Sequence, residues 1–154
     1  MIASTSELPK IGLIGVSGYA SIHVEWLLQA HKNKQLIIAA FVTVEAENNS
    51  EGAKQLKATG AQQYGSYLKM LEAQNGQLDL CFIPTGIQWH ARMTIDALKI
   101  GCNVLVEKPL AGSTSDGQAV IDAMNETGRW VAVGFQDMYT DEVATLKRMI
   151  LKKR

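Results

Sequence analysis

The sequence predicts an α/β fold in which helices cover both faces of a doubly wound, mostly parallel sheet, giving three α/β/α layers. Short apolar runs alternate with longer amphipathic ones along the whole chain. The apolar runs are rich in residues that favour strands, and the longer runs have the spacing of helices with one apolar face. Strands separated by helices are joined by right-handed crossovers, which make neighbouring strands parallel.

Five apolar runs are long enough to be buried strands. In order along the chain, they are KIGLIGV (10–16), QLIIAAFVTV (35–44), LDLCFIP (78–84), NVLVEKP (103–109) and WVAVGFQ (130–136). A further short extended piece is expected within AQQYG, between the second and third of these runs. In doubly wound folds, ligands bind beyond the carboxyl ends of the strands, so any site is expected at that edge.

Helices are expected between the strands, and capping residues mark several of their ends. The second helix has Asn49 or Ser50 as its N-cap and Gly60 at its end, because these residue types suit those positions. The fifth helix is expected to be capped near Thr114 or Ser115. The other helices are expected from about 18 to 31, before Asn75-Gly76, from WHARM to Gly101, and over the final DEVATLKRMILKKR.

Composition and charge exclude several classes of protein. The chain has 154 residues, enough for one domain, and its 47% apolar and 19% charged residues are ordinary for a globular protein. Fifteen basic and fifteen acidic side chains cancel, so no surface for nucleic acid or an anionic membrane is expected. Trp26, Trp89 and Trp130 are interpreted as packing residues of the core or of an interface. No signal peptide or membrane span is visible in the sequence, so we expect a cytoplasmic protein. Cys81 and Cys102 lack the spacing of zinc ligands, so we expect no metal site and two buried thiols.

The first apolar run leads into the turn GVSGYA, which is typical of a phosphate-binding loop. In dinucleotide-binding turns, three small residues permit a tight turn, close approach of the diphosphate, and packing of the helix on the strand. Gly15, Ser17 and Ala20 occupy these positions, and Gly18 adds freedom between them. The serine hydroxyl is a further donor for phosphate. The alternative is a strand-to-helix turn that requires small residues and binds no ligand.

The end of the second strand is where a carboxylate would bind a ribose of the cofactor. The sequence there is AAFVTVEAEN, so the position falls on Phe41, Val42 or Thr43, and Glu45 is the first carboxylate. No arginine is present there for the 2′-phosphate of NADP, and Lys54 lies further along. The choice between NAD and NADP therefore stays open.

Two further strand ends carry unusual residues. Pro84 and Thr85 follow the third apolar run, with His90 at the start of the next helix, and Glu107-Lys108-Pro109 follows the fourth run. A lysine at this edge can donate a hydrogen bond to a substrate hydroxyl, and burial would favour its use in acid–base chemistry. The alternatives are an ordinary turn at 84–86, a partly buried histidine with a satisfied hydrogen bond, and a solvated Glu-Lys pair at a strand end.

Together these segments resemble the glucose–fructose oxidoreductase/inositol dehydrogenase (Gfo/Idh/MocA) family. The segment IGLIGVSGYASIH is similar to its phosphate-binding turn, FIPTGIQWHARMTIDALKIGCNVLVEKPLA to its central signature, and VAVGFQDMY to the strand leading to its second domain. The EKP motif after an apolar strand, with a histidine at the preceding helix start, is more specific than the glycine turn. The resemblance covers almost the whole chain and implies a Rossmann fold.

The resemblance also implies an NAD(P)-dependent oxidoreductase that transfers hydride to or from a hydroxyl or ketone of a sugar, polyol or cyclitol. Lys108 matches the family lysine that lies near nicotinamide and substrate and assists proton transfer. The cofactor-binding residues expected besides Lys108 are Gly15, Ser17, Gly18, Tyr19, Ala20, Thr43, Pro84, Thr85, His90, Glu107 and Gln136.

Family members continue into an α/β substrate domain, whereas this sequence ends at Arg154. We therefore expect residues 1–154 to form the NAD(P)-binding domain, inactive without the substrate domain, and the full-length form to be a homo-oligomer. The alternatives are a dinucleotide-binding sensor or regulatory module without redox turnover, and a partner-binding domain with a vestigial cofactor pocket.

Overall fold

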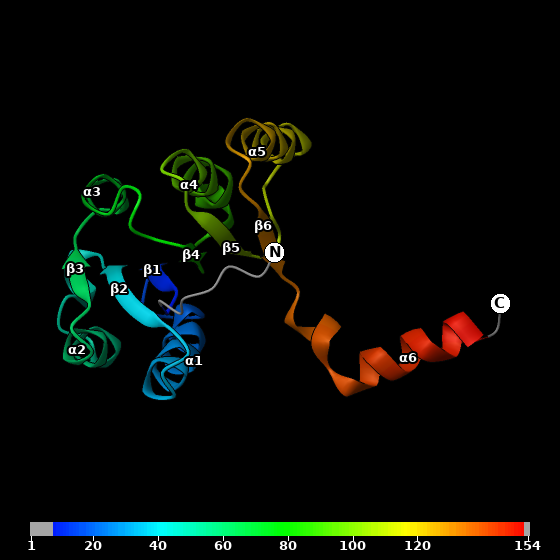
Figure 1. The fold of residues 1–154 in the computed structure, drawn as a ribbon, viewed down its shortest axis with the longest axis horizontal. Helices are drawn as coiled ribbons and strands as arrows, with labels where there is room; N and C mark the ends of the chain where they lie inside the picture. The colour runs from blue at the N-terminus through cyan, green and yellow to red at the C-terminus, as the bar shows by residue number, and fades with distance from the viewer. Residues whose placement is uncertain (1–7, 153–154) are drawn as a thin grey trace.

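The computed structural model describes residues 8–152, and its centre is one parallel six-stranded sheet in the order β3-β2-β1-β4-β5-β6 (Figure 1). Residues 1–7, where we predict no signal peptide, and the last two residues of the predicted final helix lie outside the described residues. All neighbouring strands are parallel. The strands are β1 (Lys10–Ile14), β2 (Ile37–Val42), β3 (Gln62–Tyr64), β4 (Leu80–Ile83), β5 (Asn103–Glu107) and β6 (Val131–Gly134).

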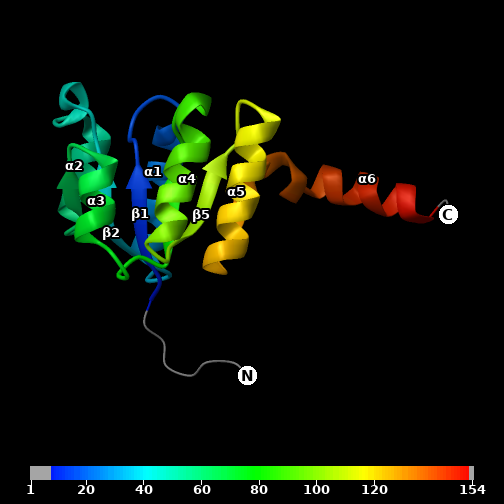
Figure 2. The same cartoon turned by 90° about the horizontal axis from the view of Figure 1, so that it is seen from above.

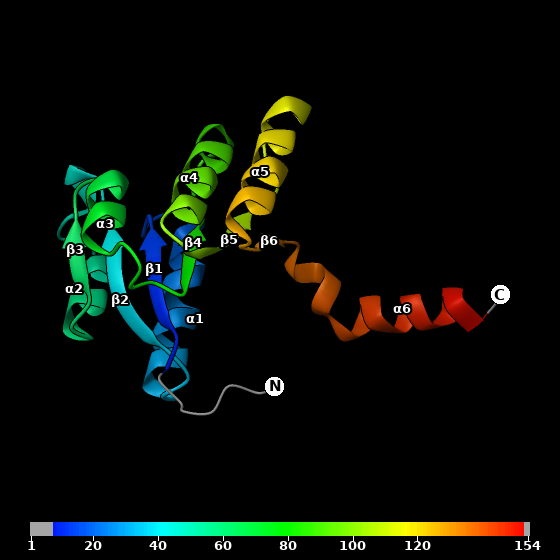
Figure 3. The same ribbon diagram turned by 45° about the horizontal axis from the view of Figure 1, so that its top comes forward.

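Helices cover both faces of this sheet, which confirms the predicted three-layer, doubly wound fold (Figures 1 and 2). One face carries α1 (Ala20–Lys32) and α2 (Glu51–Ala58). The other face carries α3 (Tyr67–Ala73), α4 (Ile87–Lys99) and α5 (Thr114–Thr127). Two short 3-10 helices, η1 (Glu45–Glu47) and η2 (Gln136–Tyr139), follow β2 and β6, and α6 (Asp141–Lys152) projects away from the sheet (Figure 3).

The core consists of two apolar clusters, one on each face of the sheet. Alternate residues of a strand point to opposite faces, so Ala40 and Val42 of β2 lie in one cluster and Phe41 lies in the other. Ile38 lies in the same cluster as Phe41, because the pairing of β2 with β1 has an irregularity between Ile38 and Ala40. Each fully buried side chain such as Phe41 contributes roughly 1.5–3 kcal/mol through removal of apolar surface from water. These two clusters hold the strand ends in fixed positions.

The two cysteines are free and buried, as expected. Burial, and then the nearby charge of Asp79, raises the pKa of Cys102 to about 12. Burial also raises the pKa of Cys81 well above its ordinary value. Both groups are therefore protonated thiols that pack as small apolar side chains at neutral pH.

The strand order places a topological switch point between β1 and β4. From β1 the chain first moves outward to β2 and β3, and it then returns to β4 on the opposite side of β1. Because the two connections leave β1 in opposite directions, a crevice opens beyond the carboxyl ends of β1 and β4. This is the edge at which the sequence places its unusual residues.

The predicted elements are present, with differences at their ends. The short extended piece of AQQYG pairs with β2 as β3, and the strand predicted over 130–136 ends at Gly134, so Gln136 belongs to η2. The side chain of Ser50 accepts a hydrogen bond from the Ala53 N–H, as predicted for the cap of α2. The cap of α5, predicted near Thr114 or Ser115, is Ser113, one residue before Thr114.

The capping bond of α5 gives a testable prediction for stability. The Ser113 hydroxyl accepts a hydrogen bond of 3.1 Å from the Asp116 N–H, which would otherwise lack an intrahelical partner. The substitution Ser113→Ala is expected to lower the free energy of unfolding by about 1 kcal/mol. Urea denaturation followed by circular dichroism measures this change. Thr114→Ala is the matched control, and an equal loss in both variants would contradict the assignment of the cap.

Candidate functional site

The turn after β1 has a backbone that only glycine adopts readily. Gly15 has a φ of +99° and Gly18 a φ of +58°, both in the left-handed region. The Gly15 N–H donates to the Val42 carbonyl oxygen at 3.1 Å, which fixes the turn to the end of β2. Ala20 is 1% exposed, and its Cβ lies 3.9 Å from where a Cβ on Gly15 would be. The small third residue therefore permits close packing of α1 on β1.

The same turn presents donors to an anion. The backbone N–H groups of Ser17, Gly18 and Tyr19 donate to no acceptor among residues 8–152. The first turn of α1 contains no acidic residue, and no described side chain caps it. Free N–H groups at a helix start, together with the helix dipole, favour a bound phosphate.

A cleft runs across the switch point. One part, of about 370 Å³, lies over the ends of β2 and β3, and an adjoining part of about 360 Å³ lies over the glycine turn. The two parts share Gly15, Val44, Glu47 and Thr85 and are therefore continuous. The remaining lining residues are Ile14, Val42, Thr43, Gly65, Ser66, Tyr67, Trp89 and Met93 in the first part, and Val16, Ser17, Tyr19, Ala20, Pro84 and Gly86 in the second.

Glu47 is the carboxylate of this cleft, and the sequence alone did not identify it. The helix η1 turns the chain after β2, so that Glu45 is exposed while Glu47 lies in the cleft and accepts a hydrogen bond from the Ser17 hydroxyl. In this structure, the hydroxyl expected to contact phosphate is thus directed to Glu47. The signal that could have found it is the second acid of the motif EAE, two residues after the first.

Thr43 lines the cleft, but its hydroxyl is engaged in a partly buried polar network. Its Oγ1 donates to Asn48 Oδ1 at 2.7 Å and accepts from Gln63 Nε2 at 2.6 Å. Gln63 Nε2 also lies 3.0 Å from Asn48 Oδ1. This network fixes the loop that carries Glu47, so Thr43 supports the wall of the cleft.

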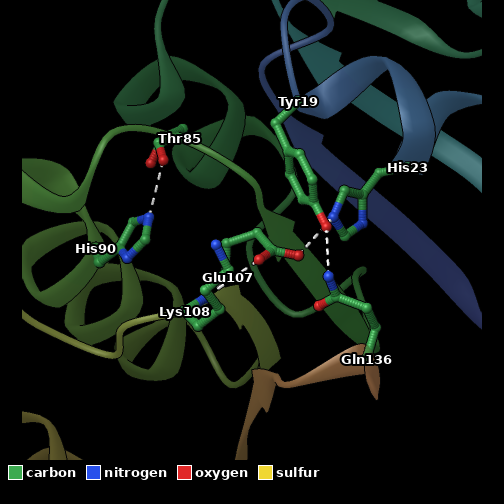
Figure 4. A network of polar contacts seen from close by, with 7 residues as sticks. All are labelled: Tyr19, His23, Thr85, His90, Glu107, Lys108 and Gln136. Carbon is green, nitrogen blue, oxygen red and sulfur yellow. Dashed lines mark hydrogen bonds and ion pairs between the residues drawn. The ribbon is translucent and has the colours of Figure 1, made fainter. Parts of the chain in front are cut away.

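Pro84 and Thr85 lie in the cleft as expected, whereas His90 lies behind it. The imidazole is 1% exposed, with Nδ1 2.7 Å from the Pro109 carbonyl oxygen and Nε2 2.9 Å from the Thr85 carbonyl oxygen (Figure 4). The structure therefore favours the alternative of a histidine with a satisfied hydrogen bond, and this histidine is fully buried. His90 connects the loop after β4 to the loop after β5.

Lys108, Tyr19 and Gln136 meet at the other end of the glycine turn (Figure 4). The exposed Lys108 side chain places its Nζ 5.8 Å from the centre of the Tyr19 ring, within reach of a cation–π interaction. Gln136 Nε2 donates to the Tyr19 hydroxyl at 2.9 Å. Desolvation, followed by the charges of Glu107 and Asp137, raises the pKa of Tyr19, so the phenol is neutral at pH 7.

The carboxylate of Glu107 is buried and points toward His23, on the Tyr19 side of this group (Figure 4). Glu107 is 6% exposed, and its Oε1 lies 2.9 Å from His23 Nε2 in α1. The alternative of a solvated Glu-Lys pair is therefore not what the structure shows: Glu107 is buried and Lys108 is exposed. Of the twelve predicted site residues, seven line the cleft, and Lys108 and Gln136 lie beside Tyr19. Gly18 belongs to the glycine turn without lining the cleft, and His90 and Glu107 are buried.

The three tryptophans do not pack in the core, whereas packing in an interface stays a prediction. Trp26, Trp89 and Trp130 are all between 44% and 59% exposed. Trp89 lies in the first turn of α4 and lines the cleft, where it can contact a planar ligand.

A parallel sheet with a glycine turn and a cleft at its switch point defines a dinucleotide-binding domain of the Rossmann type. Among residues 8–152 no group of side chains has the arrangement of a metal site. No helix within these residues is both long and apolar enough to cross a membrane.

The chain belongs to the GFO_IDH_MocA family, described as an oxidoreductase family with an NAD-binding Rossmann fold, whose model matches residues 9–135. This match confirms the resemblance and the expected class of cofactor. Among curated proteins, inositol 2-dehydrogenase of Salmonella typhimurium is 25% identical over 142 residues, 92% of this chain and 41% of the relative. The dTDP-3,4-didehydro-2,6-dideoxy-alpha-D-glucose 3-reductase of Streptomyces violaceoruber is 30% identical over 136 residues, 88% of this chain and 38% of that protein. The chain thus spans about two fifths of the length of these relatives.

Solved structures show the same fold. The WlbA dehydrogenase of Bordetella pertussis, in complex with NADH and UDP-GlcNAcA, superposes with a TM-score of 0.80 at 23% identity over 96% of this chain and 44% of that one. The scyllo-inositol dehydrogenase of Lactobacillus casei, with bound NAD(H) and scyllo-inositol, also has a TM-score of 0.80, at 20% identity over 95% of this chain and 42% of that one.

Proposed function

We propose that this chain binds NAD(H) across the switch-point cleft and serves as the nucleotide-binding part of a dehydrogenase. The observation that carries this proposal is the continuity of the cleft from β2 to the glycine turn, with free N–H groups at its centre. In this arrangement the adenosine lies over the ends of β2 and β3. The diphosphate lies at the turn between Gly15 and Ala20, and the nicotinamide extends toward Tyr19 and Lys108.

We further propose that NAD is preferred over NADP because of Glu47. This carboxylate lines both parts of the cleft and lies beside Ser17, where it can accept hydrogen bonds from ribose hydroxyls. A 2′-phosphate at the same place would be repelled by the negative charge. The lining residues include no lysine or arginine within the described chain to offset that repulsion.

Binding of NADH to the 154-residue chain tests both proposals. The melting temperature is expected to rise with NADH concentration, because a ligand that binds only the folded state stabilises it. In a titration, NADP is expected to bind at least about tenfold more weakly than NAD, a difference of about 1.4 kcal/mol. Glu47→Ala should reduce the ratio of the NADP and NAD dissociation constants. Glu45→Ala, which changes an exposed acid, should leave this ratio unchanged. Absence of NADH binding at millimolar concentration would contradict the proposed function.

We propose that the reaction is hydride transfer to or from a hydroxyl or ketone of a sugar, polyol or cyclitol. When bound, the nicotinamide supplies the hydride chemistry. Lys108 is the group we assign to the reacting oxygen, since its ammonium can donate a hydrogen bond and a proton there. The names of the inositol and sugar-nucleotide dehydrogenases that the chain resembles support this substrate class.

We propose that further polypeptide supplies the substrate domain. The helix α6 projects from the nucleotide-binding unit, and its Leu146, Ile150 and Leu151 are each more than half exposed. Such an apolar face is typical of one that other polypeptide covers.

The homo-oligomer and the cytoplasmic location remain predictions, and the free thiols of Cys81 and Cys102 support the cytoplasmic location. Sequencing the gene beyond the codon for Arg154 tests whether a substrate domain follows.

A further inference from the structure

A buried pair of ionisable side chains joins α1 to β5, and the proposed function does not use it. His23 and Glu107 are 84 positions apart in the sequence, yet His23 Nε2 lies 2.9 Å from Glu107 Oε1. They are only 5% and 6% exposed. The pair therefore links the helix that begins at the glycine turn to the strand β5, which ends just before Lys108 (Figure 4).

The other oxygen of Glu107 holds the backbone of Lys108. Glu107 Oε2 accepts a hydrogen bond of 3.2 Å from the Lys108 N–H. The space for this carboxylate exists because residue 134, opposite Glu107 in β6, is glycine. A Cβ on Gly134 would lie 2.7 Å from Glu107 Oε1, closer than real Cβ contacts, and 3.0 Å from its Cδ, so the carboxylate would have to shift. The position of Glu107 thus depends on His23 on one side and, on the other, on residue 134 being a glycine without a side chain.

The histidine ring is itself held in place. A carboxylate only accepts hydrogen bonds, so Nε2 of His23 is the donor toward Glu107. The ring centroid lies 5.9 Å from those of Tyr19 and Phe82, both edge-on, and 6.1 Å from that of Trp26. Because these aromatic rings surround it, the imidazole is confined and keeps its donor aimed at Glu107.

We propose that His23 is a positioning residue for Lys108, acting through Glu107. The chain of contacts runs from the His23 ring to the Glu107 carboxylate and then to the Lys108 N–H. It directs the lysine side chain over the Tyr19 ring, at the nicotinamide end of the cleft. The importance of this for catalysis rests on the proposed function, whereas the positioning itself is a property of the chain without cofactor.

The location of Lys108 over an aromatic ring provides a spectroscopic readout. Reductive methylation with ¹³C-formaldehyde keeps the lysine charge and gives each lysine an NMR methyl signal. Because its Nζ lies 5.8 Å from the Tyr19 ring centre, the Lys108 signal is expected to be displaced by the ring current. Loss of one signal in Lys108→Arg assigns it, and loss of the displacement in Tyr19→Leu confirms its origin.

Four variants then test the role of His23. His23→Leu removes the donor and is expected to return the Lys108 signal to the position of an exposed lysine such as Lys99. His23→Gln offers an amide donor and is expected to retain the displacement. Gly134→Ala leaves His23 intact but forces Glu107 to move, so it should abolish the displacement. Gly117→Ala, in α5 with open space around it, is the matched control and should have no effect.

Thermal melts of each variant establish that it is folded before the NMR signals are compared. An unchanged Lys108 signal in folded His23→Leu, or in folded Gly134→Ala if the first variant does not fold, would overturn the proposal. Loss of the displacement in Gly117→Ala would also overturn it, since the effect would then be general. These spectra need no cofactor, so a failure of NADH to bind the native chain would count against the proposed function only.

Discussion

Replacing Gly15 by valine is expected to weaken the binding of NADH strongly while the chain still folds. Gly15 has a φ of +99°, which costs a residue with a Cβ about 1–2 kcal/mol and a β-branched residue more. A Cβ there would also point between Ala20 and Thr85, each 3.9 Å away, where the two parts of the cleft join. The side chain would therefore occupy the approach of the diphosphate. The affinity for NADH, measured by nicotinamide fluorescence, should fall by about 100-fold or more, equivalent to about 2.7 kcal/mol.

A matched variant separates this effect from backbone strain. Gly76 also has a positive φ, +68°, and has open space around it. Its position before β4 is at the opposite edge of the sheet from the cleft. Gly76→Val should therefore lower the melting temperature as Gly15→Val does, but leave the affinity for NADH unchanged. If Gly15→Val binds NADH normally while folded, the glycine turn is only a structural turn.

The edge of the sheet that carries the site could be predicted from the sequence because it depends on topology. Alternating strands and helices fix the direction of every strand, so residues that follow strands must gather at one edge. Gly15 and Gly18 could be predicted for the same reason, since a tight strand-to-helix turn requires positive φ values. These inferences use only the local backbone and the order of the elements.

The directions of individual side chains could not be predicted in the same way. Glu45 and Glu47 are two residues apart, and only the tight turn of η1 determines which one enters the cleft. Glu107 lies beside Lys108 but points inward, because its partner His23 comes from a helix 84 positions earlier. Such contacts depend on tertiary packing, and one sequence without an alignment carries no direct signal for them.

Replacing Lys108 by alanine is expected to remove catalysis while leaving cofactor binding intact. The residues that line the cleft are unchanged by this substitution, so the dissociation constant for NADH should stay within about threefold, less than 1 kcal/mol. Loss of a positioned proton donor should lower kcat by about 10²–10⁴-fold in the dehydrogenase that contains the substrate domain. The assay follows NADH absorbance with cyclitols and sugars as substrates.

The substitution Lys108→Arg distinguishes charge from proton transfer. Arginine keeps the positive charge over the Tyr19 ring, but it does not release a proton at neutral pH. If Lys108 only orients the reacting oxygen, Lys108→Arg should recover much of the rate lost in Lys108→Ala. If it also transfers a proton, both variants should stay slow, and raising the pH should not restore Lys108→Arg. An enzyme whose turnover is unaffected by Lys108→Ala would contradict the assigned role. If the protein binds NADH without turnover, it is instead a dinucleotide-binding sensor or regulatory module. Lys108→Ala should then leave its response to NADH unchanged, because NADH binding depends on the glycine turn and Glu47 but not on Lys108.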